Sequence, residues 1–191
     1  WEGWTPTDRL GQHVTGATLG IIGFGRIGQA MAKRAHFGFD MKIVFFNRSK
    51  VDPAIAERYG AEQMVTVEDV LAASDFVSLH CPGGAETRHL INAERLKVMR
   101  PNGILINTAR GDVVDEAALA AALEAGTIAC AGLDVFEAEP KVHPKLVELT
   151  NCVLNPHLGS ATLSTRVKMG EKVVMNLISY FDRQKMPDRL T

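Results

Sequence analysis

The stretch Leu19-Gly20-Ile21-Ile22-Gly23-Phe24-Gly25-Arg26-Ile27-Gly28-Gln29 decides the fold of this chain. A short apolar run ends in the pattern Gly23-x-Gly25-x-x-Gly28, a helix-forming segment follows, and a second apolar run covers Met41 to Phe46. This order is typical of a βαβ unit that binds a dinucleotide. Gly23 permits the tight turn, Gly25 lets a pyrophosphate approach the backbone, and Gly28 lets the helix pack close to the strand. The free N–H groups at the helix start favour phosphates. The alternative is a strand–turn–helix connection without a ligand.

Composition excludes several classes of protein. The net charge is −1 without a basic stripe, which argues against nucleic acid or an anionic membrane surface as a partner. The apolar runs are shorter than the ~20 residues that a membrane span needs. Cys81, Cys130 and Cys152 lack CxxC spacing, so we expect neither a metal site nor a disulfide framework. This usage fits a reducing cytoplasm, where we expect the protein to act.

The remaining chain alternates between strand and helix patterns. We predict strands at 18–22, 41–46, 76–79, 104–107, 128–133 and 152–154, and helices at 26–38, 53–59, 66–73, 93–99, 116–125 and 160–181. This alternation predicts an α/β fold with a Rossmann-type, doubly wound parallel sheet. We expect residues 1–16 to be a lead-in segment, 17–159 the dinucleotide-binding domain, and 160–191 a C-terminal helix and tail. The first residue, Trp1, is not an initiator Met and no signal-peptide pattern follows, so we expect the chain to begin within a longer protein.

The loop after the second strand indicates the choice of cofactor. An NAD site normally has Asp or Glu at this place to bind the ribose 2′-OH, whereas this chain has Asn47-Arg48-Ser49-Lys50. Arg48, Ser49 and Lys50 suit a 2′-phosphate, which a carboxylate would repel. We therefore predict that NADP(H) is preferred and that NAD(H) is possible. The alternative is a polar surface loop around an NAD site that lacks its acid.

Further site residues follow other strands, because the carboxyl ends of parallel strands border the ligand crevice. We expect Cys81 and Pro82 to contribute backbone there, and Thr87 either to contact the cofactor or to close a turn. After the next predicted strand, Arg110 presents a bidentate cation that suits a carboxylate or a 2-keto acid. Its alternative is a surface ion pair.

Three further signatures stand in order along the chain. They are Asn107-Thr108-Ala109-Arg110-Gly111, the run from Asp134 to Pro140 that contains Glu139, and Pro156-His157-Leu158-Gly159-Ser160-Ala161. With the glycine motif, they closely resemble the D-isomer-specific 2-hydroxyacid dehydrogenases, over nearly the whole chain. Within that family, the first strand and the Asn47–Ser49 loop look most like glyoxylate/hydroxypyruvate reductases.

The resemblance implies an NADPH-dependent oxidoreductase that reduces a small 2-keto acid to a D-2-hydroxy acid, and a homodimer. It implies that Arg110, Glu139 and His157 are catalytic and that Asp134 lies near the nicotinamide. It also implies that the C-terminal helix returns to a substrate domain mostly absent from this chain. The expected cofactor-binding residues are Gly23, Gly25, Arg26, Ile27, Gly28, Asn47, Arg48, Ser49, Cys81, Pro82, Thr87, Thr108, Ala109, Arg110, Asp134, His157 and Gly159.

The chemistry of the three catalytic residues agrees with these roles. His157 is a natural proton donor at neutral pH, and Glu139 would fix its tautomer and favour the imidazolium. Arg110 would hold the substrate carboxylate or polarise the keto oxygen. Glu137 and His143 are rivals, but the family's catalytic Glu directly precedes a Pro, so the resemblance favours Glu139, which precedes Pro140. We expect His143 to lie at the surface. We expect the other histidines considered as rivals to lie at solvated or helix-surface positions: His13, His36 and His89.

Two other function classes remain open at this stage. The family includes transcriptional corepressors that use the fold as a dinucleotide-sensing interaction module and keep the Arg/Glu/His set. A methyltransferase with a similar glycine loop is the third interpretation, but it would leave Arg110, Glu139 and His157 without a joint purpose.

Overall fold

The structure is a computed structural model that describes residues 3–7 and 10–188. It divides into two units, one reaching to Asn155 and one beginning at Pro156, which we describe separately. The domain boundaries expected from the sequence stay a prediction.

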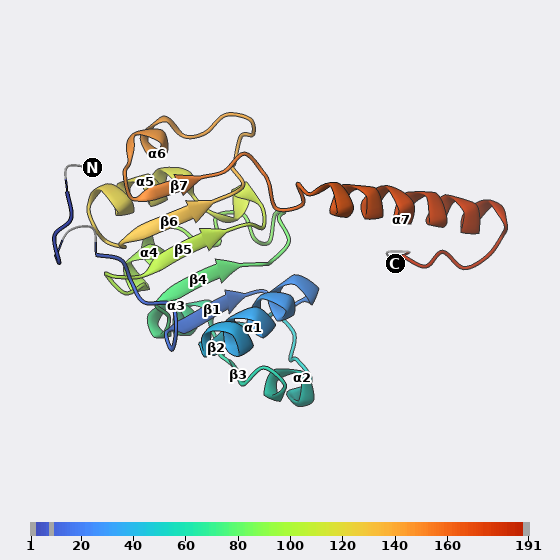
Figure 1. Ribbon diagram of the computed structural model, residues 1–191, viewed down its shortest axis with the longest axis horizontal. Coiled ribbons are helices and arrows are strands. Elements are labelled where there is room, and N and C mark those ends of the chain that lie inside the picture. The colour runs from blue at the N-terminus through green and yellow to red at the C-terminus, as the bar shows by residue number, and fades with distance from the viewer. Residues whose placement is uncertain (1–2, 8–9, 189–191) are drawn as a thin grey trace. The chain divides into compact units, whose positions relative to one another are not determined.

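The first unit is built on one parallel sheet of seven strands in the order β3-β2-β1-β4-β5-β6-β7 (Figure 1). The strands are β1 (Thr18–Ile22), β2 (Lys42–Phe46), β3 (Ala61–Gln63), β4 (Phe76–Leu79), β5 (Ile104–Asn107), β6 (Cys130–Leu133) and β7 (Cys152–Leu154). The order reverses between β1 and β4, because β1 pairs with β2 on one side and with β4 on the other. The predicted Rossmann-type fold is therefore confirmed, and the crevice of such a sheet lies at this reversal.

Helices connect the strands. They are α1 (Arg26–Phe39), α2 (Pro53–Glu57), α3 (Val67–Ala73), α4 (Ala93–Val98), α5 (Glu116–Glu124) and α6 (Pro144–Glu148), with a 3₁₀ turn at Gly111–Val113. Side-chain caps fix several starts: Thr66 forms a capping box with Asp69, while Asn92 and Asp115 accept from backbone N–H groups. α4 and α5 begin at the predicted residues, Ala93 and Glu116, and α3 begins at Val67, one residue after the predicted start.

The sheet separates two hydrophobic clusters. The smaller cluster joins Leu19 and Ile21 of β1 to Ala32 and Ala35 of α1 and to Phe45 of β2. The larger cluster takes Ile22 on the other side of β1 and alternate apolar residues of β4, β5 and β6, packed against α3, α4, α5 and α6. The alternation along β1 places successive side chains in different clusters, as the period of a strand requires.

The sequence missed β3 and α6, and it placed the starts of β6 and α7 two or more residues too early. β3 is a three-residue edge strand whose sequence, Ala61-Glu62-Gln63, has little apolar character. α6 buries only Leu146 among its five residues, so its pattern resembles a polar loop. β6 begins at Cys130 rather than at 128, and the second unit's helix α7 begins at Leu163 rather than at 160.

The second unit contains α7 (Leu163–Phe181). Thr162 caps the helix by accepting from the Thr165 N–H at 3.3 Å. Beyond the helix, Asp188 pairs with Lys172 at 2.9 Å and holds the following segment against it. Among the described residues, no helix is both long enough and apolar enough to cross a membrane.

Candidate functional site

The glycine turn has the geometry that its sequence predicts. Gly23 has a φ of +96°, and a Cβ atom there would lie 2.7 Å from the backbone N of Cys81. A Cβ at Gly28 would lie 2.2 Å from the Gly23 carbonyl oxygen. A Cβ at Gly25 would meet no described atom within 4 Å, so this backbone is open to a ligand. Gly23 and Gly28 therefore allow close packing of the backbone, and Gly25 leaves space for a ligand.

Gly25 is also the N-cap residue of α1, and among the described residues no side chain caps it. The N–H groups of the first turn, where Arg26 and Ile27 lie, consequently keep their hydrogen-bonding capacity and the positive end of the helix dipole. A pyrophosphate fits such a helix start.

A cavity of about 400 Å³ opens beside this turn. Its lining includes, of the residues expected from the sequence, Gly23, Gly25, Asn47, Arg48, Ser49, Cys81, Pro82 and Thr87. Three separate loops, after β1, β2 and β4, thus contribute to one cavity at the carboxyl ends of their strands. This is where a sheet of this topology binds its ligand.

Asn47 connects two of these loops. Its Oδ1 accepts from the Phe24 N–H at 3.1 Å, and its Nδ2 donates to the Ser49 carbonyl and hydroxyl oxygens at 3.0 and 3.1 Å. Arg48 extends from this loop with 85% of its side chain exposed, and it forms an ion pair with Glu86. The cation expected to bind a 2′-phosphate therefore lies at the cavity and has a carboxylate beside it.

The loop after β4 closes the same cavity. The Ser78 Oγ and the His80 Nε2 lie 2.9 Å apart, within hydrogen-bond distance. Burial lowers the pKa of the His80 imidazole. Burial also raises the pKa of the Cys81 thiol. Thr87 donates its hydroxyl to the Pro82 carbonyl at 2.6 Å. It therefore closes a turn, which is one of the two predicted alternatives. These side chains shape the wall, and burial favours the uncharged forms of the imidazole and the thiol.

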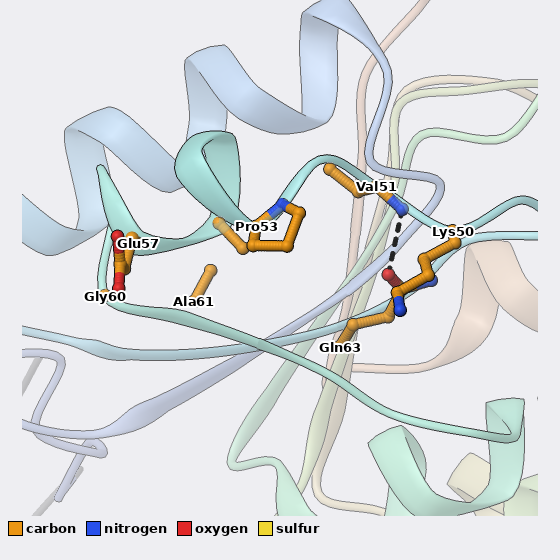
Figure 2. Close-up of a pocket in the computed structure, with 8 residues that line it drawn as sticks. Lys50, Val51, Pro53, Glu57, Gly60, Ala61 and Gln63 are labelled. Atoms are coloured by element: carbon orange, nitrogen blue, oxygen red, sulfur yellow. Dashed lines mark hydrogen bonds between the residues drawn. The ribbon is translucent and has the colours of Figure 1, made fainter.

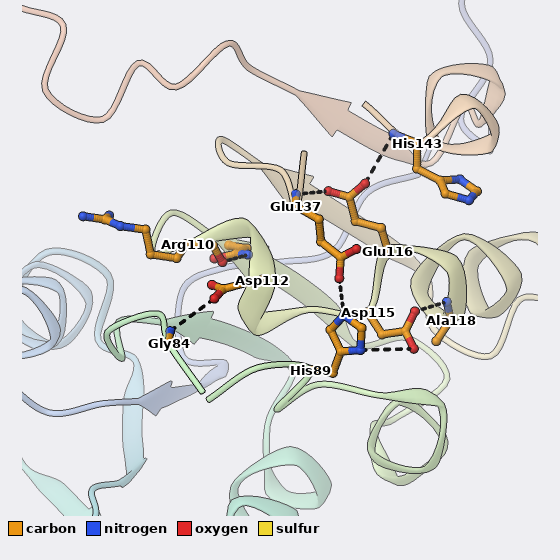
Figure 3. Close-up of polar contacts among 10 residues, drawn as sticks. Gly84, His89, Arg110, Asp112, Asp115, Glu116, Ala118, Glu137 and His143 are labelled. Carbon is orange, nitrogen blue, oxygen red and sulfur yellow. Dashed lines mark hydrogen bonds and ion pairs between the residues drawn. The ribbon is translucent and has the colours of Figure 1, made fainter. Parts of the chain in front are cut away.

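The segment after β5 presents Arg110. Asn107 shapes it, because its Oδ1 accepts from the Ala109 N–H at 3.0 Å and its Nδ2 donates to the Arg110 carbonyl at 2.9 Å. Thr108 is exposed and Ala109 is buried. The exposed Arg110 side chain donates to the Ala109 carbonyl at 2.6 Å and projects from the loop (Figure 3).

The Arg110 loop touches the wall of the cavity. Gly83 lines the cavity, and a Cβ there would lie 2.9 Å from the Arg110 Cγ. The neighbouring Gly84 donates its N–H to Asp112 Oδ2 at 3.1 Å (Figure 3). Contact between these loops places the Cβ and Cγ of Arg110 next to the cavity wall.

The loop that carries Glu139 packs against the same segment. A Cβ at Gly111 would lie 1.9 Å from the Phe136 carbonyl carbon, so the two backbones are in direct contact. Glu139 Oε1 accepts from the Phe136 N–H at 3.0 Å. Asp134, which is buried, donates its backbone N–H to the Asn107 carbonyl at 2.9 Å. The structure thus brings together the loops of Arg110, Asp134 and Glu139.

Glu116 and His89 hold the Glu139 loop from outside. Glu116 is 6% exposed, and its carboxylate accepts from the Glu137 N–H at 2.7 Å and from the His143 N–H at 3.3 Å (Figure 3). Glu137 in turn pairs through its side chain with His89. The loop is therefore fixed on both sides of Glu139.

Two rival histidines are less exposed than expected. His89 was expected at a solvated or helix-surface position, and it is 34% exposed and pairs with Glu137. His143 was expected at the surface, and it is half-buried, with its Nδ1 buried and without a hydrogen-bond partner among the described residues. The polar sequence around the loop hides how closely its backbone packs.

His157 and Gly159 belong to the second unit. His157 adopts a φ of +54° in the turn that precedes α7. The Ala161 N–H donates to the Leu158 carbonyl at 2.9 Å and continues this turn. Across the described residues, no group of three or more His, Cys, Asp or Glu side chains is arranged to hold a metal ion.

Sequence reasoning missed Asp112, Glu116 and Glu86 as parts of this region. Asp112 lies shortly before the predicted helix and Glu116 is its first residue, where acidic residues ordinarily interact favourably with the helix dipole. That pattern gives no sign that their carboxylates bind the backbone of distant loops. Glu86 follows a glycine-rich turn and reads as a surface charge.

Comparison with known proteins agrees with this geometry. Residues 1–159 match the family described as D-isomer specific 2-hydroxyacid dehydrogenase, NAD binding domain. The chain belongs to this family. A glyoxylate reductase from Thermococcus litoralis is 53% identical over 188 residues, which cover 98% of this chain and 56% of that protein. A glyoxylate/hydroxypyruvate reductase B from Serratia proteamaculans is 47% identical over 94% of this chain and 55% of that protein.

Solved structures of the family share the fold. The crystal structure of an NADPH-dependent glyoxylate/hydroxypyruvate reductase from Sinorhizobium meliloti, in complex with NADP and malonate, has a TM-score of 0.89 and 38% identity. It matches 100% of this chain, which covers 57% of that structure. The chain thus spans about half the length of the relatives that it matches.

Proposed function

We propose that this chain is the cofactor-binding part of a reductase that uses NADPH to convert glyoxylate or hydroxypyruvate to the 2-hydroxy acid, in the D configuration where the product is chiral. The observation that carries the proposal is the contact of Gly83, in the cavity wall, with the Arg110 side chain. In this proposal the cavity holds the dinucleotide, and Arg110, whose Cβ and Cγ lie beside the cavity wall, carries a guanidinium of the kind that binds carboxylates. The relatives named as glyoxylate reductases support the substrate class.

The residues have separate roles in this proposal. When bound, the reduced nicotinamide supplies the hydride. Arg110 holds the substrate carboxylate or polarises the keto oxygen, since its planar fork matches such oxygens. His157 donates the proton that the reduced oxygen requires, and Glu139 fixes the tautomer of that imidazole. Asp134 is assigned to the nicotinamide end of the cofactor. A homodimer and a cytoplasmic location stay predictions.

The preference for NADPH rests on Arg48. Its side chain lies at the cavity on the loop after β2, and Ser49 of that loop lines the same cavity, while Lys50 lines a different one. A charge-assisted bond to a phosphate contributes ~1.5 kcal/mol at an exposed position, which corresponds to about tenfold in affinity. We expect Arg48→Gln to raise the Kd for NADPH about tenfold and to leave that for NADH unchanged. Unchanged binding of both cofactors would contradict this assignment.

The activity is tested by steady-state reduction of glyoxylate and hydroxypyruvate by the whole protein, with NADPH compared with NADH. His157→Ala is expected to lower kcat by about 10²–10⁴-fold, the usual contribution of a general acid. His13→Ala, at an exposed histidine of the first unit, is the matched control and should retain full activity. Full activity in His157→Ala would exclude it as the proton donor, and cofactor binding without turnover of either acid would refute the substrates.

A further inference from the structure

The loop after β2 is held in shape by one side chain from β3. Gln63 is half-buried, and its Oε1 accepts from the Val51 N–H at 3.0 Å (Figure 2). Its Nε2 donates to the Asn47 carbonyl at 3.4 Å and to the Ser49 carbonyl at 3.2 Å. One amide group thus binds the backbone on both sides of Arg48.

We propose that Gln63 is a positioning residue that sets the preference for NADPH over NADH, by fixing the loop that presents Arg48 and Ser49 to the 2′-phosphate. This inference rests on the proposed function. A long, exposed side chain such as Arg48 loses conformational freedom when it binds, and an ordered backbone beneath it reduces the total cost. A loop that must order itself on binding gives weaker affinity for the same contacts.

The chemistry of the site requires an amide at this position. The loop offers one N–H donor and two carbonyl acceptors to the same side chain. The Gln amide satisfies all three, since it carries one acceptor oxygen and an NH₂ group with two donors. A carboxylate would lack the donors, and an aliphatic side chain would lack both kinds of group.

The place of Gln63 in the sheet favours this specific role. β3 lies at the edge of the sheet, has three residues and pairs with β2 alone. Gln63 is its last residue and lies opposite Phe45, one residue before the end of β2. The strand therefore ends where the loop begins, and its final side chain reaches the loop rather than the sheet.

The test is a fluorescence titration of this chain with NADPH and with NADH, accompanied by thermal unfolding. We expect Gln63→Met to weaken NADPH about tenfold, since it removes bonds that together exceed the ~1.4 kcal/mol of a tenfold change, and NADH less than twofold. Gln63→Asn keeps the amide but is one methylene too short to reach the loop. If Gln63→Met does not fold, Gln63→Asn should lower the ratio of the affinity for NADPH to the affinity for NADH. A lower melting temperature with an unchanged ratio in a folded variant would mean a merely structural role and would overturn the inference.

A matched control comes from the glycine turn. Gln29 donates its Nε2 to the Phe24 carbonyl at 3.0 Å, in the turn that would hold the pyrophosphate common to both cofactors. Gln29→Met should therefore weaken NADPH and NADH by the same factor. Arg48→Gln separates the two proposals. If Arg48→Gln lowers the ratio of NADPH affinity to NADH affinity and the Gln63 variants do not, only this inference fails. If Arg48→Gln also leaves that ratio unchanged, the assignment of Arg48 and this inference both fail.

Discussion

The buried carboxylate of Glu116 gives the sharpest test of how the Glu139 loop is held. Replacing Glu116 by Gln keeps the size of the side chain but sets an NH₂ group against one of the two backbone N–H donors, from Glu137 and His143. Hydrogen bonds to a charged group contribute ~1.5–3 kcal/mol each, and a neutral one about 1 kcal/mol. Losing one bond and weakening the other, less the relief of removing a buried charge, leaves a net loss of ~2–3 kcal/mol.

This loss is measurable by thermal unfolding. For a chain of this size each 1 kcal/mol lowers the Tm by roughly 2–4 °C, so we expect Glu116→Gln to melt about 4–12 °C below the wild type. Glu124 lies on the same helix, and its exposed ion pair with Lys145 contributes little. Glu124→Gln is therefore the control, with an expected shift below about 2 °C. In the whole protein, Glu116→Gln should also lower kcat for keto acid reduction while the KM for NADPH stays unchanged.

One result would refute this reasoning. If Glu116→Gln and Glu124→Gln melt at the same temperature, the backbone of the Glu139 loop does not depend on the buried carboxylate. The loop would then be held by its other contact, between Gly111 and Phe136.

Gly111→Ala puts a Cβ 1.9 Å from the Phe136 carbonyl carbon and should destabilise the protein by ~1–3 kcal/mol in urea unfolding, whereas Gly132→Ala, whose Cβ meets no described atom within 4 Å, serves as control. Equal stability of these two variants would contradict the close contact. Burial lowers the pKa of His80, so its unfolded state binds a proton that the folded state does not; wild-type stability should fall relative to His80→Gln as pH drops below about 6.5, and a difference independent of pH would argue against this. Burial raises the pKa of Cys152 to about 11 from an ordinary value of 9.0, so at pH 8 its thiolate fraction is about 100-fold lower, partly offset by higher nucleophilicity. We expect iodoacetamide to alkylate it roughly tenfold more slowly than a free thiol by mass spectrometry, and equal rates would exclude the raised pKa.

The main elements of the sheet could be predicted because their apolar runs are confined by turn residues. β1, β4 and β5 have the predicted bounds, since each is a short apolar run that must be buried on both faces of a parallel sheet. The glycine turn was predictable for a similar reason: its conformation admits few other residues. β3 could not be found, because an edge strand of three residues needs little apolar character.

The side chains that hold the site together were beyond sequence reasoning. Glu116 directly follows the helix cap Asp115, and both look like ordinary acids of a first helical turn. Their difference arises only when the segment from Glu137 to His143 folds over the helix and buries one carboxylate but not the other. Gln63 is similar, because its three partners belong to a loop that precedes it by more than ten residues. The sequence shows which residues can donate or accept hydrogen bonds, but it does not show which of them come together in the fold.

The two hydrophobic clusters on opposite sides of the sheet reach the candidate site unequally. The smaller one includes Phe24 of the glycine turn, while the larger one includes Ile22, directly before that turn, and supports the ends of β5 and β6, from which Arg110 and Glu139 extend. Variation confined to the smaller cluster can therefore alter the glycine turn while leaving the segments of Arg110 and Glu139 in place, whereas variation in the larger cluster reaches both.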